Sequence, residues 1–194
     1  MGRSLYKSIA KEHLRGDHPD TAEKSADVDL AEYSALKEEQ IGRIALRDGA
    51  LHVNIVVSLS LFAFGVSEEQ NRIIPLLLVP YSSLILFWIF YTNDTYVSRI
   101  RHYVEEVTRP ALKAKLQLPD PLAWEAVHRR VSLGRVFRKT LTAVVLLLSF
   151  VGPASLSLLV ASDLPLDFLT SGIQIGGHVC LIICALGILV RTFD

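Results

Sequence analysis

A run of twenty residues without a charge, Ile73 to Thr92 (IIPLLLVPYSSLILFWIFYT), most strongly limits what this chain can fold into. At about 1.5 Å per helical residue the run is about 30 Å long, which equals the hydrocarbon thickness of a bilayer. The segment therefore predicts a transmembrane helix. Further apolar blocks at residues 50–66, 141–161 and 173–190 predict three more spans.

These blocks predict an all-α, polytopic membrane protein with four transmembrane helices and extended cytoplasmic helices. The apolar residues, 51% of 194, are gathered in blocks, whereas a soluble domain would distribute them. The first two spans are joined by a short polar turn, which favours an antiparallel hairpin. The polar segments are assigned to a flexible tail (1–27), a helix that leads into the membrane (28–49) and a helical loop (93–140). No cleaved targeting segment is expected at the N-terminus.

Prolines predict where the helices are disturbed. Pro80 lies deep in the second span and should kink it, and Gly152-Pro153 should kink the third span. An amphipathic stripe after Asp94 predicts a helix that stops at Pro110.

Basic residues predict the orientation. Nineteen of the twenty Lys and Arg residues lie in the segments 1–49 and 93–140 or at Arg191, and Arg72 alone lies on the other side. The positive-inside rule therefore places both termini and the central loop in the cytoplasm. The chain is then expected to be a multi-pass protein of the inner or plasma membrane. The net charge of zero gives no support for nucleic-acid binding.

The sequence contains none of the common nucleotide-binding, hydrolase or zinc-protease motifs and no paired CxxC. We therefore expect no catalytic residue, no cofactor and no metal site. His178 with Cys180 and Cys184 resembles a metal cluster, but the spacings of two and four do not place all three on one face. Gly176, Cys180 and Cys184 repeat every four residues and predict a helix-packing face of small residues, in which the cysteines are reduced.

Polar residues near one end of the first two spans form a candidate vestibule. Its members are Arg43, Arg47, Asp48, His52, Asn54, Asp94 and Arg99. The alternative is ordinary pairing on helix surfaces, because Glu39–Arg43 and Asp48–His52 are four residues apart and such pairs contribute about 0.2–0.5 kcal/mol each. His52 and Asn54 lie near the end of their span, so on this alternative they reach the interface and need no partner.

Several stretches carry a resemblance. EEQIGRIALRD precedes the first span, LLLVPYSSLILFWIFYTND closes the second, and SRIRHYVEE and a later Trp124-Glu125 follow. Over about residues 35–128 the chain resembles a group of small bacterial integral membrane proteins, to which no activity is assigned. The small-bundle layout also resembles helical membrane effectors of bacterial defence systems, an analogy of architecture that transfers no residue role.

From these features we expect a non-enzymatic, homo-oligomeric membrane protein. Its charged cytoplasmic helices would bind a cytoplasmic protein partner or sense a signal, and the lipid bilayer surrounds its spans. The alternative is an ion channel or pore-forming effector lined by the polar first span. A third reading is an enzyme that acts on lipid with Asp48, His52 or Asp94 as acid or base.

Overall fold

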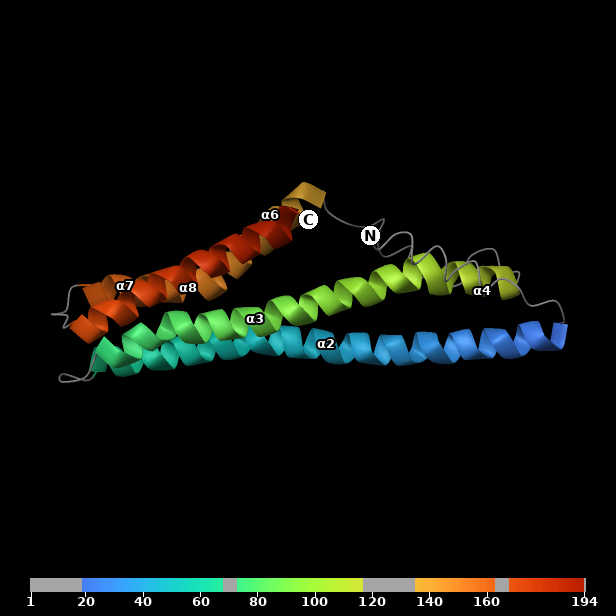
Figure 1. Cartoon of the computed structure of the whole chain (residues 1–194), viewed down its shortest axis with the longest axis horizontal. Helices are drawn as coiled ribbons and strands as arrows, with labels where there is room; N and C mark the ends of the chain where they lie inside the picture. The colour runs from blue at the N-terminus through green and yellow to red at the C-terminus, as the bar shows by residue number, and fades with distance from the viewer. Residues whose placement is uncertain (1–18, 68–72, 117–134, 163–167, 194) are drawn as a thin grey trace. The chain divides into compact units, whose positions relative to one another are not determined.

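The computed structural model describes residues 19–67, 73–116, 135–162 and 168–193, and all of them are helical (Figure 1). Four helical segments are long and apolar enough to cross a membrane: Lys24–Ser67, Ile73–Leu116, Lys139–Ser162 and Phe168–Thr192. For the described residues, the prediction of helical structure with four segments long and apolar enough to cross a membrane is confirmed.

The helices are longer than the predicted spans. The first half of the chain forms α2 (Pro19–Ser67), α3 (Ile73–Tyr103), the π-helix η1 (Val104–Thr108) and α4 (Arg109–Leu116). The second half forms α6 (Arg135–Leu146), the π-helix η2 (Leu147–Val151), α7 (Gly152–Ser162) and α8 (Phe168–Phe193).

The start of α2 differs from the sequence prediction. Residues 19–27, assigned above to a flexible tail, are helical, and α2 continues without a break through the predicted boundary at residues 49–50. Pro19 suits the first helical position, where its missing N–H has no intrahelical partner to lose. The rest of the predicted tail, and Trp124-Glu125 in the loop, lie outside the described residues.

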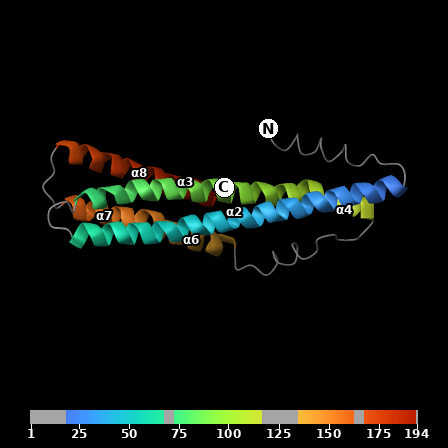
Figure 2. The same ribbon diagram turned by 90° about the horizontal axis from the view of Figure 1, so that it is seen from below.

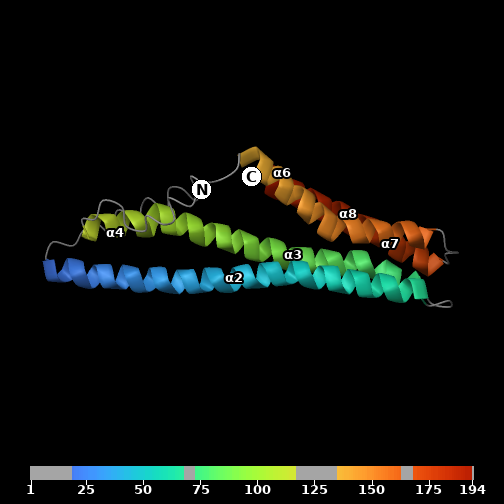
Figure 3. The same ribbon diagram turned by 180° about the vertical axis from the view of Figure 1, so that it is seen from behind.

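The chain divides into two compact units. Residues 1–45 and 93–132 form one, called here the polar unit, and residues 46–92 and 133–194 form the other, called the apolar unit. Helices α2 and α3 contribute to both units, and within each they run antiparallel (Figures 1 and 3).

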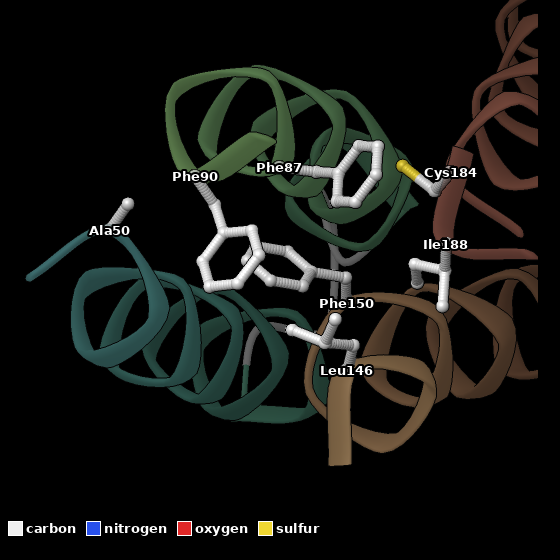
Figure 4. Packing of buried hydrophobic residues seen from close by; sticks show 7 residues of the cluster. All are labelled: Ala50, Phe87, Phe90, Leu146, Phe150, Cys184 and Ile188. Carbon is white, nitrogen blue, oxygen red and sulfur yellow. The ribbon is translucent and has the colours of Figure 1, made fainter. Parts of the chain in front are cut away.

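The apolar unit has two apolar clusters. The first contains Ala50, Phe87, Phe90, Leu146, Phe150, Cys184 and Ile188 (Figure 4), and the second contains Leu76, Leu77, Leu158 and Ala161. The ring of Phe150 is fully buried, with its centroid 5.5 Å from that of Phe87 and 5.7 Å from that of Phe90. Figure 2 shows α7 and α8 beside the α2–α3 hairpin, which supplies Ala50, Phe87 and Phe90 to the first cluster.

The outside of the apolar unit is also apolar. Trp88, Leu148 and Ile175 are each about two-thirds exposed. A contiguous exposed apolar surface is unfavourable in water and is the expected surface against hydrocarbon. The exterior therefore fits a bilayer as its solvent.

The polar unit is held together by contacts between α2 and the α3–η1–α4 segment. Lys115 Nζ lies 2.7 Å from Asp29 Oδ2, and both side chains are less than a tenth exposed. The Tyr103 hydroxyl donates a hydrogen bond to Glu32 at 2.9 Å. Ionic and polar pairing thus accompanies the small apolar core of this unit.

Pro110 does not end its helix, and this sequence prediction is wrong. In η1 the Arg109 N–H donates to the Val104 carbonyl five residues earlier, and α4 then continues past Pro110 to Leu116. Proline disrupts an α-helix because its ring meets the carbonyl of residue i−4, and one wider turn moves that carbonyl away. The helix can therefore pass the proline.

The same device precedes Pro153. In η2 the Gly152 N–H donates to the Leu147 carbonyl, and α7 continues from Gly152. At Pro80, by contrast, α3 continues without a change of helix type. The predicted disturbance at Gly152-Pro153 thus takes the form of a π-turn.

Candidate functional site

The candidate vestibule is divided between the two units. Arg43, Asp94 and Arg99 belong to the polar unit, whereas Arg47, Asp48, His52 and Asn54 belong to the apolar unit. Each group is therefore described within its own unit, and a convergence of Asp94 with Arg47 and Asp48 stays a prediction.

In the polar unit, Arg43 and Arg99 share one aromatic neighbour. The guanidinium carbon of Arg43 is 4.6 Å from the centroid of the Tyr96 ring, and that of Arg99 is 5.7 Å from it. Arg43 also donates to Glu39 at 3.3–3.4 Å and to Asn93 Oδ1 at 3.4 Å. The Glu39–Arg43 contact is the surface pairing expected of residues four apart. The shared Tyr96 ring was not predicted from the sequence, although the three-residue spacing of Tyr96 and Arg99 is a signal for it.

In the apolar unit, the charged residues of α2 pair locally. Arg47 and Asp48 are in contact at 2.8 Å, so the partner of Asp48 is its chain neighbour and not His52, as the four-residue spacing suggested. His52 is exposed and Asn54 is fully buried. Residues two apart in a helix are about 200° apart around its axis, so within this chain Asn54 alone of the two faces the interior.

Asn54 fills a gap left by a proline. Its Nδ2 donates to the Ser149 carbonyl in η2 at 2.6 Å. In an α-helix that carbonyl would accept from residue 153, but Pro153 has no N–H. The expectation that Asn54 needs no partner is therefore wrong, because its fully buried side chain donates to a helix carbonyl that lacks its α-helical donor.

Two buried serines accompany Asn54. Ser58 and Ser83 are 1% exposed, and among the described residues the Oγ atoms of both, like Asn54 Oδ1, have no hydrogen-bond partner. Ser82 and Ser157, by contrast, donate to the carbonyl three residues earlier, the usual use of a serine in an apolar helix.

Helix register places these oxygens between the two apolar clusters. Along α2, Asn54 and Ser58 lie between Ala50, which belongs to the first cluster, and Phe62, which packs on the second. Along α3, Ser83 lies between the same two clusters. The polar atoms therefore form a layer with apolar side chains on both sides. The four-residue repeat of Ala50, Asn54 and Ser58 is a sequence signal for it that was not used.

The predicted small-residue face of α8 lies against α3 of the same chain. A Cβ at Gly176 would collide with the Tyr81 hydroxyl, which donates to the Ile173 carbonyl at 2.7 Å. Cys180 and Cys184 are buried free cysteines. This face is therefore occupied within the chain, and a second subunit would have to use another surface.

The described part of the chain contains no group of three His, Cys, Asp or Glu side chains arranged to hold a metal ion. His178 is exposed, unlike the two cysteines that follow it, and its Nδ1 lies 2.9 Å from the Gln174 carbonyl. Scans against protein-family models, curated proteins and solved structures found no match to this chain.

Proposed function

We propose that this chain is an integral protein of a bacterial inner or plasma membrane, with both termini cytoplasmic. The apolar unit anchors the protein, and the polar unit binds a cytoplasmic protein partner or responds to a signal without catalysing a reaction. One observation carries this proposal: two helices that are long and apolar enough to cross a membrane continue, unbroken in α2 and through a π-turn in α3–α4, into a second compact unit that contains polar pairs.

Helix length supports a working part outside the bilayer. α2 has 49 residues and is about 74 Å long at 1.5 Å per residue, more than twice the hydrocarbon thickness. The acids and bases of the polar unit hold helices together, as in the Asp29–Lys115 and Glu32–Tyr103 contacts. These contacts between helices support a rigid polar unit that serves as a binding or sensing module.

Cysteine labelling in intact cells tests the orientation. In a background with Cys180 and Cys184 replaced by alanine, a cysteine at Glu69 should react with an impermeant thiol reagent. A cysteine at Lys113 should react only after the cells are opened. The reverse pattern would refute the proposed topology.

Photo-crosslinking in native membranes tests the binding role. A photoreactive residue at Ile41, which is 68% exposed in the polar unit, should give a discrete protein adduct. The matched position is Leu112, which is 1% exposed and should give none. If Ile41 and the equally exposed Val28 give no protein adduct, the partner-binding proposal fails.

We also propose that the protein is a homo-oligomer. Its apolar exterior offers surfaces for self-association other than the face of α8 that Tyr81 occupies. An Ile41 adduct with the mass of two chains would support this. Protein that is monomeric at every concentration in several detergents would contradict it.

A second candidate function is an ion channel, and the layer of Asn54, Ser58 and Ser83 favours it, because polar groups in membrane helices are functional by default. The clusters on both sides of that layer would act as hydrophobic gates. Ion flux in liposomes should be lost in Asn54→Leu and kept in the control His52→Leu, which alters an exposed side chain of the same helix. Equal flux in both variants, or none in the parent protein, would rule this function out.

A further inference from the structure

Two arginines from different helices share one tyrosine ring in the polar unit. Arg43 of α2 and Arg99 of α3 lie 4.6 Å and 5.7 Å from the centroid of Tyr96. Both are positively charged at all physiological pH values, and the ring attracts them without neutralising them. Two cations therefore lie around one ring, and one of them, Arg43, also pairs with the Glu39 carboxylate.

The existing partners leave donors available. Arg99 is exposed and makes no ion pair or hydrogen bond with any residue that the structure describes. Arg43 contacts Glu39 at 3.3–3.4 Å and Asn93 Oδ1 at 3.4 Å, both long for charge-assisted hydrogen bonds, and the Glu39 side chain is half exposed. Surface pairs of this type contribute little to stability, so an incoming anion can replace Glu39 at small cost.

The position along the helices selects the anion. Tyr96 is four residues beyond Thr92, where the uncharged run ends, which is about 6 Å along α3. Arg43 is three residues before Leu46, where the apolar unit begins, which is about 4.5 Å along α2. The headgroup layer of a bilayer is about 5–8 Å thick on each side, so the Arg43–Tyr96–Arg99 cluster lies at the depth of lipid phosphates.

We propose that Arg43, Tyr96 and Arg99 form a binding site for the phosphate of an anionic phospholipid. The guanidinium groups donate to the phosphate oxygens, in the planar geometry that arginine offers to phosphate, and Tyr96 holds both groups in place. This proposal rests on the proposed location of the protein in a membrane. It does not depend on which side of the membrane the polar unit occupies. Bound lipid would tie the polar unit to the bilayer surface.

Lipid titration of the purified full-length protein tests the site. Native mass spectrometry in detergent would measure retention of phosphatidylglycerol, with phosphatidylcholine as the zwitterionic arm and glycerol phosphate as the free-phosphate arm. A guanidinium that donates directly to the bound phosphate contributes about fivefold or more in affinity, so R43Q/R99Q should lose roughly 25-fold for phosphatidylglycerol. Tyr96→Leu should also weaken retention, whereas Tyr96→Phe should keep it, because the ring and not the hydroxyl holds the arginines.

Arg101→Gln is the matched control. Arg101 is exposed and lies two residues from Arg99, about 200° around the same helix, so this change removes the same charge at the same depth from another face. It should change retention by less than about twofold. An equal loss in Arg101→Gln, or no preference for phosphatidylglycerol, would overturn the site, and tight binding of glycerol phosphate would identify a free-phosphate site instead. Detergent gives lipid access from either side, so a reversed topology would leave this binding intact and the two proposals fail separately.

Discussion

The hydrogen bond from Asn54 to Ser149 offers the sharpest test of how this fold tolerates proline inside an apolar helix. Asn54 Nδ2 donates at 2.6 Å to a carbonyl that Pro153 leaves without its α-helical donor. Asn54→Leu removes the donor and keeps the number and branching of the side-chain heavy atoms. Pro153→Ala restores an N–H that can donate to the same carbonyl once the turn returns from the π to the α register. The two changes should therefore compensate each other.

The magnitude follows from the burial of the pair. A buried carbonyl left without a donor costs about 1–3 kcal/mol, whereas side-chain hydrogen bonds between membrane helices contribute about 0.6 and at most about 1.7 kcal/mol. Asn54→Leu also removes the buried Oδ1 atom that has no partner, which offsets part of the loss. In a double-mutant cycle that offset cancels, because it occurs in both backgrounds. We expect a coupling free energy of about 1–2 kcal/mol between positions 54 and 153.

Reversible unfolding in mixed micelles measures the four free energies of the cycle. Asn54→Leu should be destabilising in the parent protein and nearly neutral in the Pro153→Ala background. His52→Leu, on the exposed face of α2, should change stability by less than about 0.5 kcal/mol. Pro80→Ala is the control for proline removal and should show no coupling to Asn54→Leu. Additive effects of Asn54→Leu and Pro153→Ala would refute the reasoning.

Other predictions concern packing and a buried ion pair. Gly187→Ala should cost about 1–3 kcal/mol in the same assay, because the added Cβ would lie 2.7 Å from the Phe87 ring, whereas Gly49→Ala has open space and should be neutral or stabilising by up to about 1 kcal/mol. Lys115→Met should cost about 3–5 kcal/mol by leaving Asp29 buried and unpaired, and a second change, Asp29→Leu, should recover most of that loss, as followed by proteolysis of the polar unit. Equal stabilities of the two glycine variants, or no recovery in the double variant, would contradict these assignments.

Pro110 shows where reasoning from local sequence failed. The rule that proline ends a helix treats the α-helical register as fixed. In η1 one wider turn moves the register, and the buried side chains of Val104, Val107 and Leu112 then stabilise the continued helix. A rule based on proline alone does not include that packing, so it predicts the end of the helix too early.

The candidate site shows a related limit. Residue type identified Asn54 as unusual in an apolar block, but its partner is 95 residues away in the chain. Ser58 and Ser83 are common residues in apolar helices, so their residue type alone does not mark them, and Tyr96 lies in the amphipathic stripe that the sequence predicts after Asp94. Which of them are buried together depends on the register between helices, which a single sequence does not encode locally.

For the described residues, the sequence by itself determined the helical class and the number of segments that are long and apolar enough to cross a membrane. Length and apolar composition are properties of each segment alone, and a bilayer imposes a minimum length on any helix that crosses it. Only the tertiary structure decided that His52 faces outward while Asn54 faces inward, and that the small-residue face of α8 packs against Tyr81. The physical reason is that burial and hydrogen-bond partners arise from packing between helices that are distant in the chain. The Ser149 carbonyl, whose α-helical donor is missing at Pro153, accepts a hydrogen bond from the Asn54 side chain of α2.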